Sequence, residues 1–106
     1  MKILNAFSLN MLKSLDASII SEEISLDKAK GLAKAGVESA VGHADTAAVF
    51  GSQLGVPVPA NRTTVSLETG DTVLIGQYQG PRLSEGATTL PEGATIKWCL
   101  VTVEYK

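Results

Sequence analysis

The chain contains few side chains that could carry acid–base or phosphate chemistry, so each of them stands out. Among its 106 residues there are one histidine, His43, and two arginines, Arg62 and Arg82. Imidazole titrates near neutral pH, so His43 is the candidate for proton transfer, for example as the general acid that protonates a phosphodiester's leaving oxygen. It follows Gly42 at an expected strand-to-helix junction, where helix amides attract anions and a glycine allows close approach. The alternative is a histidine that only caps the helix or fills the core.

The two arginines are candidates for phosphate binding. Arg82 opens the segment Arg82-Leu83-Ser84-Glu85-Gly86, which follows a Gly80-Pro81 break at the end of an expected strand. A guanidinium in such a loop is suited to bidentate contact with phosphate. The alternative for Arg82 and Glu85 is a solvated surface pair, which contributes little. Arg62 could bind phosphate or pair with a carboxylate at an interface.

A short internal repeat covers this segment. The residues from Leu83 to Thr88 recur, nearly unchanged, from Leu90 to Thr95. Seven residues is too short a period for a solenoid, so this is a local duplication within a loop. Any role given to Glu85 must therefore explain why Glu92 does not have it.

Composition excludes several classes of protein. The chain is of ordinary size for one domain, residues 1–106, and 44% hydrophobic with 19% charged residues is a globular composition. A single cysteine, Cys99, excludes an intramolecular disulfide and a cysteine-cluster zinc site, and no metal-ligand, Walker or dinucleotide motif predicts a metal or cofactor. The net charge of −2 argues against broad binding to duplex DNA. Because there is no apolar run of about 20 residues and no signal peptide, we expect no membrane partner and a cytoplasmic location.

The expected elements favour an α/β or α+β sandwich, with helices on a mixed sheet. We expect the α/β class, as a single small domain whose central mixed β-sheet is flanked by helices. Residues 6–15 read as a loop with one helical turn, residues 19–20 are too few to classify, and residues 68–71 form a hairpin turn. The expected strands are 2–4, 37–41, 63–67, 72–79 and 96–105, and the expected helices are 25–35 and 44–54.

Three blocks of residues resemble one known family, the viral ring nucleases. The blocks are Leu4-Asn5-Ala6-Phe7-Ser8-Leu9-Asn10-Met11-Leu12, Ala40-Val41-Gly42-His43-Ala44-Asp45-Thr46-Ala47 and Arg82-Leu83-Ser84-Glu85-Gly86. They occur in the family's order and at similar separations. Viral ring nucleases are type III anti-CRISPR proteins that bind and cleave cyclic tetra-adenylate, the second messenger of that defence. The resemblance implies a small α/β domain that acts as a homodimer in the host cytoplasm without a metal.

The resemblance also implies roles for individual residues. His43 would be the general acid, Arg82 would hold phosphate charge, and Glu85 would orient or tune the histidine or contact a ribose. The other residues that the resemblance implies in ligand contact are Asn5, Ala6, Ser8, Asn10, Gly42 and Arg62, with Arg62 near the dimer interface. Independently of the family, the polar residues of the first block could simply form turns and caps.

Two features depart from the family pattern. Many relatives have a small hydroxyl residue where this chain has Asp45, and a carboxylate near an anionic ring is costly unless it points away or caps the helix. Asp45 and Thr46 are both plausible helix caps, and Asp45 is poorly placed to orient His43, because residues two apart on a helix do not face each other. Residues 96–105 read as a strand where relatives often have a helix. These departures keep open a second hypothesis, a protein that sequesters the ring, or another anionic ligand, without cutting it. A third hypothesis is a structural or interaction protein, in which the small-residue face of the expected helix 44–54 and the long last strand build a homodimer.

Overall fold

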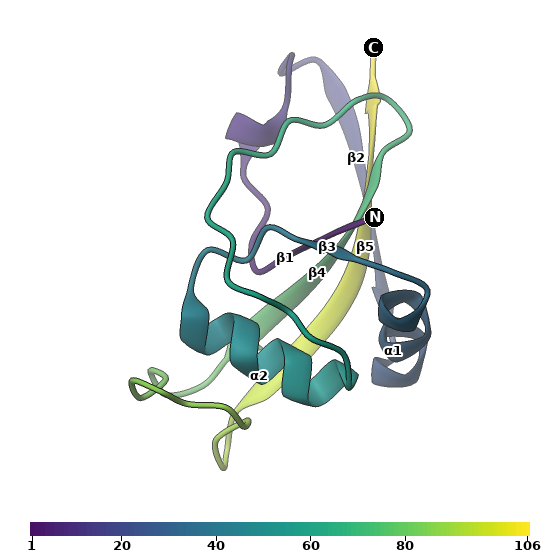
Figure 1. Cartoon of the computed structure of the whole chain (residues 1–106). Coiled ribbons are helices and arrows are strands. Elements are labelled where there is room, and N and C mark those ends of the chain that lie inside the picture. The colour runs from purple at the N-terminus through teal and green to yellow at the C-terminus, as the bar shows by residue number, and fades with distance from the viewer.

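A five-stranded mixed sheet lies at the centre of the protein (Figure 1), in a computed structural model that describes residues 1–106. The order across the sheet is β2-β5-β4-β1-β3. The strand β1 lies parallel to both β3 and β4, whereas β5 pairs antiparallel with β2 and β4. The strands are β1 (Lys2–Leu4), β2 (Ala17–Ile24), β3 (Glu38–Ser39), β4 (Thr72–Gln79) and β5 (Thr95–Tyr105). The predicted α/β class with a mixed sheet and helices is therefore confirmed.

The two α-helices each follow a strand, and residues next to their ends determine where they begin or stop. The Ser25 hydroxyl accepts a hydrogen bond from the Lys28 N–H at 3.1 Å and so caps α1 (Leu26–Lys34). The second helix, α2 (Ala44–Leu54), ends at Gly55, whose N–H bonds to the Gly51 carbonyl at 2.8 Å. A short 3₁₀ helix, η1 (Leu9–Met11), is the one helical turn predicted within residues 6–15.

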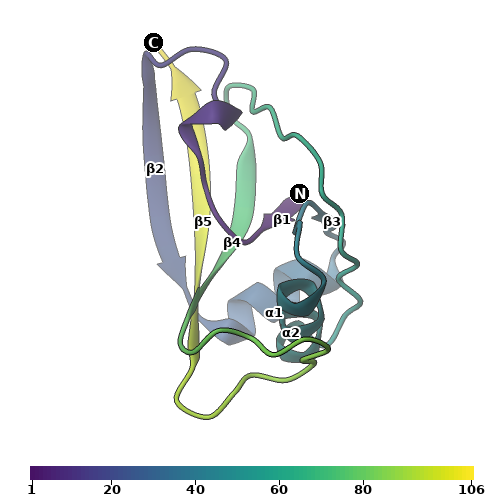
Figure 2. The same cartoon turned by 90° about the vertical axis from the view of Figure 1, so that its left-hand side faces the viewer.

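Each face of the sheet buries its own apolar cluster, because successive strand residues point to opposite faces. Both helices pack on one face, and in Figures 1 and 2 they lie against the lower part of the sheet. The helix side is built from Ile3, Ile24, Ala29, Ala33, Val41, Ala47, Phe50, Leu54, Val58, Leu74 and Trp98. The other side is built from Leu4, Ala40, Val65, Leu67, Val73, Ile75, Val101 and Val103. Residues 55–71 climb the molecule in both views and contribute Val58 to the helix side and Val65 and Leu67 to the other side.

Two predicted strands are wrong in whole or in part. Residues 63–67 do not form a strand, and 68–71 do not join a hairpin: β4 already has β1 and β5 on its two sides, so no edge remains for a third neighbour. Only Leu67 bridges to another segment, at Leu12. The predicted strand 37–41 shortens to Glu38–Ser39. The sequence predicts no strand around residues 19–20, but they belong to β2, an edge strand with most of its middle exposed.

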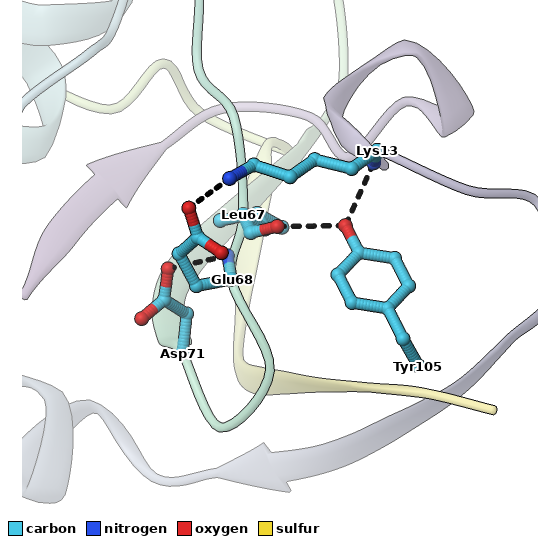
Figure 3. A network of polar contacts seen from close by, with 5 residues as sticks. All are labelled: Lys13, Leu67, Glu68, Asp71 and Tyr105. Atoms are coloured by element: carbon cyan, nitrogen blue, oxygen red, sulfur yellow. Dashed lines mark hydrogen bonds and ion pairs between the residues drawn. The ribbon is translucent and has the colours of Figure 1, made fainter.

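A network of polar contacts surrounds Tyr105 at the carboxyl end of β5 (Figure 3). The Tyr105 hydroxyl donates to the Leu67 carbonyl at 2.6 Å and accepts from the Lys13 N–H at 2.7 Å. The Lys13 ammonium also pairs with Glu68, and this contact raises the pKa of the Lys13 ammonium above its ordinary value. The Asp71 carboxylate accepts from the Glu68 N–H at 2.8 Å. The network therefore ties residues 12–13 and the turn at 68–71 to the end of β5, away from the helices.

Candidate functional site

A hollow of about 550 Å³ lies beside the amino end of α2 and the carboxyl end of β4. Carboxyl ends of parallel strands are where open α/β sheets bind ligands. Figure 1 shows the loop after β4 swinging out beneath the start of α2. The seven lining residues come from these two segments: His43, Asp45, Thr46, Tyr78, Gly80, Arg82 and Leu83. The sole histidine and one of the two arginines, far apart in sequence, thus share one concave surface.

A second hollow, of about 210 Å³, lies at the opposite ends of the same parallel strands. Met1, Lys2, Glu38 and Asp71 are among the residues that line it. It contains no histidine or arginine, and it lies at the strand starts rather than at the strand ends. We therefore assign the candidate site to the larger hollow on its chemistry and its place in the sheet.

His43 occupies the N-cap position of α2 but does not cap it with its side chain. Its backbone is extended (φ −118°, ψ 126°), and its carbonyl accepts the Ala47 N–H at 2.9 Å, which starts the helix. The imidazole makes no capping hydrogen bond and is exposed, so His43 is neither a side-chain cap nor a core histidine. The first helical amides and the helix dipole add partial positive charge beside the ring.

Gly42 is packed against Arg62 rather than against open space. A Cβ added to Gly42 would lie 3.4 Å from the Arg62 Cγ. The Asn61 N–H reaches the Val41 carbonyl at 2.8 Å, and this bond holds the Arg62 segment alongside the residues that precede His43. Arg62 is exposed and does not line the hollow. Within one chain, therefore, Gly42 leaves room for the Cβ and Cγ atoms of Arg62, and Arg62 packs beside the residue that precedes His43 without lining the hollow.

The carboxyl end of β4 contributes a side chain that sequence reasoning missed. Tyr78 is half-buried, lines the hollow and donates its hydroxyl proton to the Pro81 carbonyl. This bond closes the chain reversal that presents Arg82. An aromatic ring two residues before the Gly80-Pro81 break was the available signal. A ring face on a ligand hollow can stack a nucleobase.

Arg82 and Glu85 lie on the same loop but differ in their relation to the hollow. Arg82 is exposed and lines it, whereas Glu85 is exposed and does not. The protein's two ion pairs, Lys13–Glu68 and Lys28–Glu22, involve neither residue. The surface-pair alternative is therefore absent, because Arg82 forms no ion pair with Glu85 or with any other carboxylate.

Asp45 makes a contact that the sequence did not suggest. Its Oδ1 accepts a hydrogen bond from the Gly86 N–H at 3.0 Å, so the first turn of α2 is bonded to the loop after β4. Asp45 and Thr46 occupy the second and third positions of the helix, because His43 is the N-cap. The prediction that either residue is the N-cap is wrong for this reason.

The polar residues after β1 lie apart from the hollow in a single chain. Ser8 caps η1 by accepting the Asn10 N–H at 3.2 Å, which is the turn-and-cap alternative for these residues. None of Asn5, Ala6, Ser8 and Asn10 lines the hollow. In Figure 1 the chain leaves β1 upward toward η1, whereas the loop after β4 lies below α2.

The structure contains neither a cluster of metal-ligating side chains nor a membrane-spanning helix. No three histidine, cysteine, aspartate or glutamate side chains are grouped so that they could hold a metal ion. No helix has both the length and the apolar character that crossing a lipid bilayer requires.

Comparison with known proteins places the chain in a family. The model of the STIV B116-like family matches residues 1–98. Among solved structures, B116 of Sulfolobus turreted icosahedral virus has a similar fold, with a TM-score of 0.76 and 26% sequence identity over 96% of this chain and 99% of B116. No curated protein sequence matches the chain. Because the family model spans nearly the whole sequence, the chain belongs to the STIV B116-like family.

Proposed function

We propose that the protein is a metal-independent ring nuclease, a phosphodiesterase that binds cyclic tetra-adenylate and cleaves it to linear di-adenylate products. Its role would be to silence type III CRISPR defence as a viral anti-CRISPR protein in the host cytoplasm. The observation that carries the proposal is the meeting of His43 and Arg82 in one hollow at the start of α2. Membership of a family that includes a protein of a Sulfolobus virus supports the viral setting.

The groups in the hollow suit cleavage of a phosphodiester by its own ribose. The adenosine 2′-hydroxyl attacks phosphorus in line, the P–O2′ bond forms, and the P–O5′ bond breaks. The exposed His43 imidazolium gives its proton to the departing O5′, while the 2′-hydroxyl proton leaves to solvent. The product end is a 2′,3′-cyclic phosphate. The Arg82 guanidinium neutralises phosphate charge.

A homodimer would match the symmetry of the ring. Cyclic tetra-adenylate carries four phosphates, and one chain offers a single histidine and few free cations near the hollow. Two copies related by a two-fold axis would present two copies of His43, of Arg82 and of the α2 amino end to one ring. These local groups can bind an anion even though each chain has a net charge of −2.

The test is cleavage of cyclic tetra-adenylate by the purified protein in EDTA, followed by separation of the intact ring from linear products. We expect metal-free turnover, and we expect H43A to lower it by about 10²–10⁴-fold, the usual contribution of a general acid. R82K keeps the charge and loses the bidentate fork, so it should retain more activity than R82A.

The outcomes separate the hypotheses. Tight stoichiometric binding with only the intact ring recovered would replace the enzyme by a sequestering protein. Full turnover by H43A would remove His43 from the reaction. Absence of both binding and cleavage at enzyme excess would refute the proposed function.

A further inference from the structure

The internal repeat folds into two matching turns. In the first, the Ala87 N–H reaches the Ser84 carbonyl at 3.0 Å, and in the second the Ala94 N–H reaches the Pro91 carbonyl at 3.1 Å. Gly86 and Gly93 hold the third positions with φ of +80° and +81°, a region that glycine enters without cost. Glu85 and Glu92 therefore occupy equivalent second positions, and the turns themselves do not distinguish them.

The surroundings distinguish the two turns. The Gly86 N–H of the first turn donates to the Asp45 carboxylate on α2. The second turn receives no such bond, and its buried Ala94 packs instead against Gly80, where an added Cβ would lie 2.6 Å from the Ala94 Cβ. The first turn is thus held at the rim of the hollow, and the second is packed at the base of the loop.

The Asp45 bond closes a loop around the hollow. Asp45 stands two residues after His43 and lines the same hollow, and Gly86 stands one residue after Glu85 and four after Arg82. The Asp45–Gly86 bond therefore links the helix end that carries His43 to the loop that carries Arg82 and Glu85. Since Asp45 is at the second position of α2, the helix dipole stabilises its charge there.

We propose that Asp45 is a positioning residue for the proposed ring cleavage, which this inference presupposes. By accepting the Gly86 N–H it holds the first turn of the repeat against the amino end of α2, which carries His43. This assigns a use to the carboxylate that would otherwise repel an anionic ring. It also selects Glu85 over Glu92, because only the turn that carries Glu85 is bonded to the helix.

Three substitutions distinguish the hydrogen bond that Asp45 accepts from the negative charge of its carboxylate. D45N keeps an oxygen that can accept the Gly86 N–H and removes the charge. D45S keeps a polar group, but the serine side chain is shorter than that of aspartate, so its hydroxyl does not reach the Gly86 N–H, which lies 3.0 Å from the Asp45 Oδ1. D27S is the matched control, because Asp27 holds the same second position in α1 and bonds to no loop. Any effect of charge on a helix end is common to D45S and D27S.

The first measurement does not depend on catalysis. Amide exchange at Gly86 should be about 10-fold faster in D45S than in wild type, as for loss of one charge-assisted hydrogen bond. D27S should leave Gly86 unchanged, and Gly93 should be unaffected in every variant. The second measurement separates binding from chemistry by single-turnover cleavage and by the affinity for cyclic tetra-adenylate.

We expect D45S to slow the single-turnover step at least about 10-fold without weakening binding by a similar factor, because it loosens the loop and removes a repelling charge. D45N should keep more of the rate than D45S and should bind the ring more tightly. An unchanged Gly86 exchange in D45S, or a wild-type cleavage rate, would overturn the assignment. If wild type itself fails to cleave, the proposed function fails, and the Gly86 exchange still decides whether Asp45 holds the turn.

Discussion

Gly76 is closely covered by two aromatic rings in the core, and this packing yields a prediction of stability. Gly76 lies in the middle of β4 beneath Phe50 of α2 and Trp98 of β5, whose ring centroids are 5.0 Å apart. A Cβ on Gly76 would lie 2.6 Å from the Phe50 Cζ and 2.7 Å from the Trp98 Cζ3. Carbon atoms pack best at about 3.5–4.0 Å, so G76A forces both rings to move by about 1 Å.

Neither ring has room to move freely. Phe50 and Trp98 are both buried, and backbone pairing holds β4 between β1 and β5. Forcing a methyl group into such a core costs about 1–3 kcal/mol. For a domain of this size, each 1 kcal/mol lowers Tm by about 4–8 °C. The same movement would displace α2, whose amino end carries His43.

The matched control is another glycine-to-alanine change. Gly31 lies in α1 with nothing within 4 Å of an added Cβ. G31A should stabilise the protein by about 0.5–1 kcal/mol, because alanine is the better helix residue. Urea unfolding followed by far-ultraviolet circular dichroism gives both values without depending on the fluorescence of Trp98.

A second change at Phe50 tests the mechanism itself. F50L removes the ring atoms nearest to the added methyl, so G76A should cost less in the F50L background than in wild type, by about 1 kcal/mol. Part of the cost should remain, because Trp98 is still in the way. If G76A is as stable as wild type, or if its cost is the same in both backgrounds, the packing argument is wrong.

Three other predictions concern polar groups. Y105F removes a hydroxyl that donates to one backbone carbonyl at 2.6 Å and accepts an N–H at 2.7 Å, so the urea midpoint should fall by the equivalent of about 1 kcal/mol. E85Q should lower ring cleavage about 10-fold or more while E92Q leaves it at the wild-type rate, and equal effects would refute the distinction between the turns. Pairing with Glu68 raises the pKa of the Lys13 ammonium above its ordinary value of 10.5. The pairing therefore stabilises the fold fully below pH 10.5, and this stability is lost as the pH rises through the elevated pKa. The urea midpoints of wild type and K13Q should converge in that alkaline range.

The helices were predictable because their ends are encoded locally. Ser25 and Gly36 bracket α1, and Gly55 closes α2, so capping residues and apolar spacing were enough. The edge strand β2 lacked such a signal. Ile19 and Ile20 are adjacent and point to opposite faces, yet they are 41% and 55% exposed, so no alternation between apolar and polar residues marks the strand.

The segment 63–67 shows the opposite failure. Its residues have high β propensity, but a strand also needs a free neighbour, and β4 is already paired on both sides. Pairing is decided by the whole sheet, and local propensity yields to it. The same limit applies to the site. His43 and Arg82 could be singled out by type, but the Asp45 bond to Gly86 joins segments 41 residues apart that only the fold brings together.

The repeated segment shows how much of a site lies outside its motif. Two nearly identical stretches form the same turn, with a glutamate and a glycine at equivalent positions. Local sequence therefore gives both the same shape and the same chemistry. Only the first lies within reach of α2, where the Asp45 carboxylate takes its glycine N–H, and only the first is preceded by Arg82 at the hollow. A carboxylate that looked unfavourable beside an anionic ligand is thus what bonds one copy of the turn, and not the other, to the helix that carries His43.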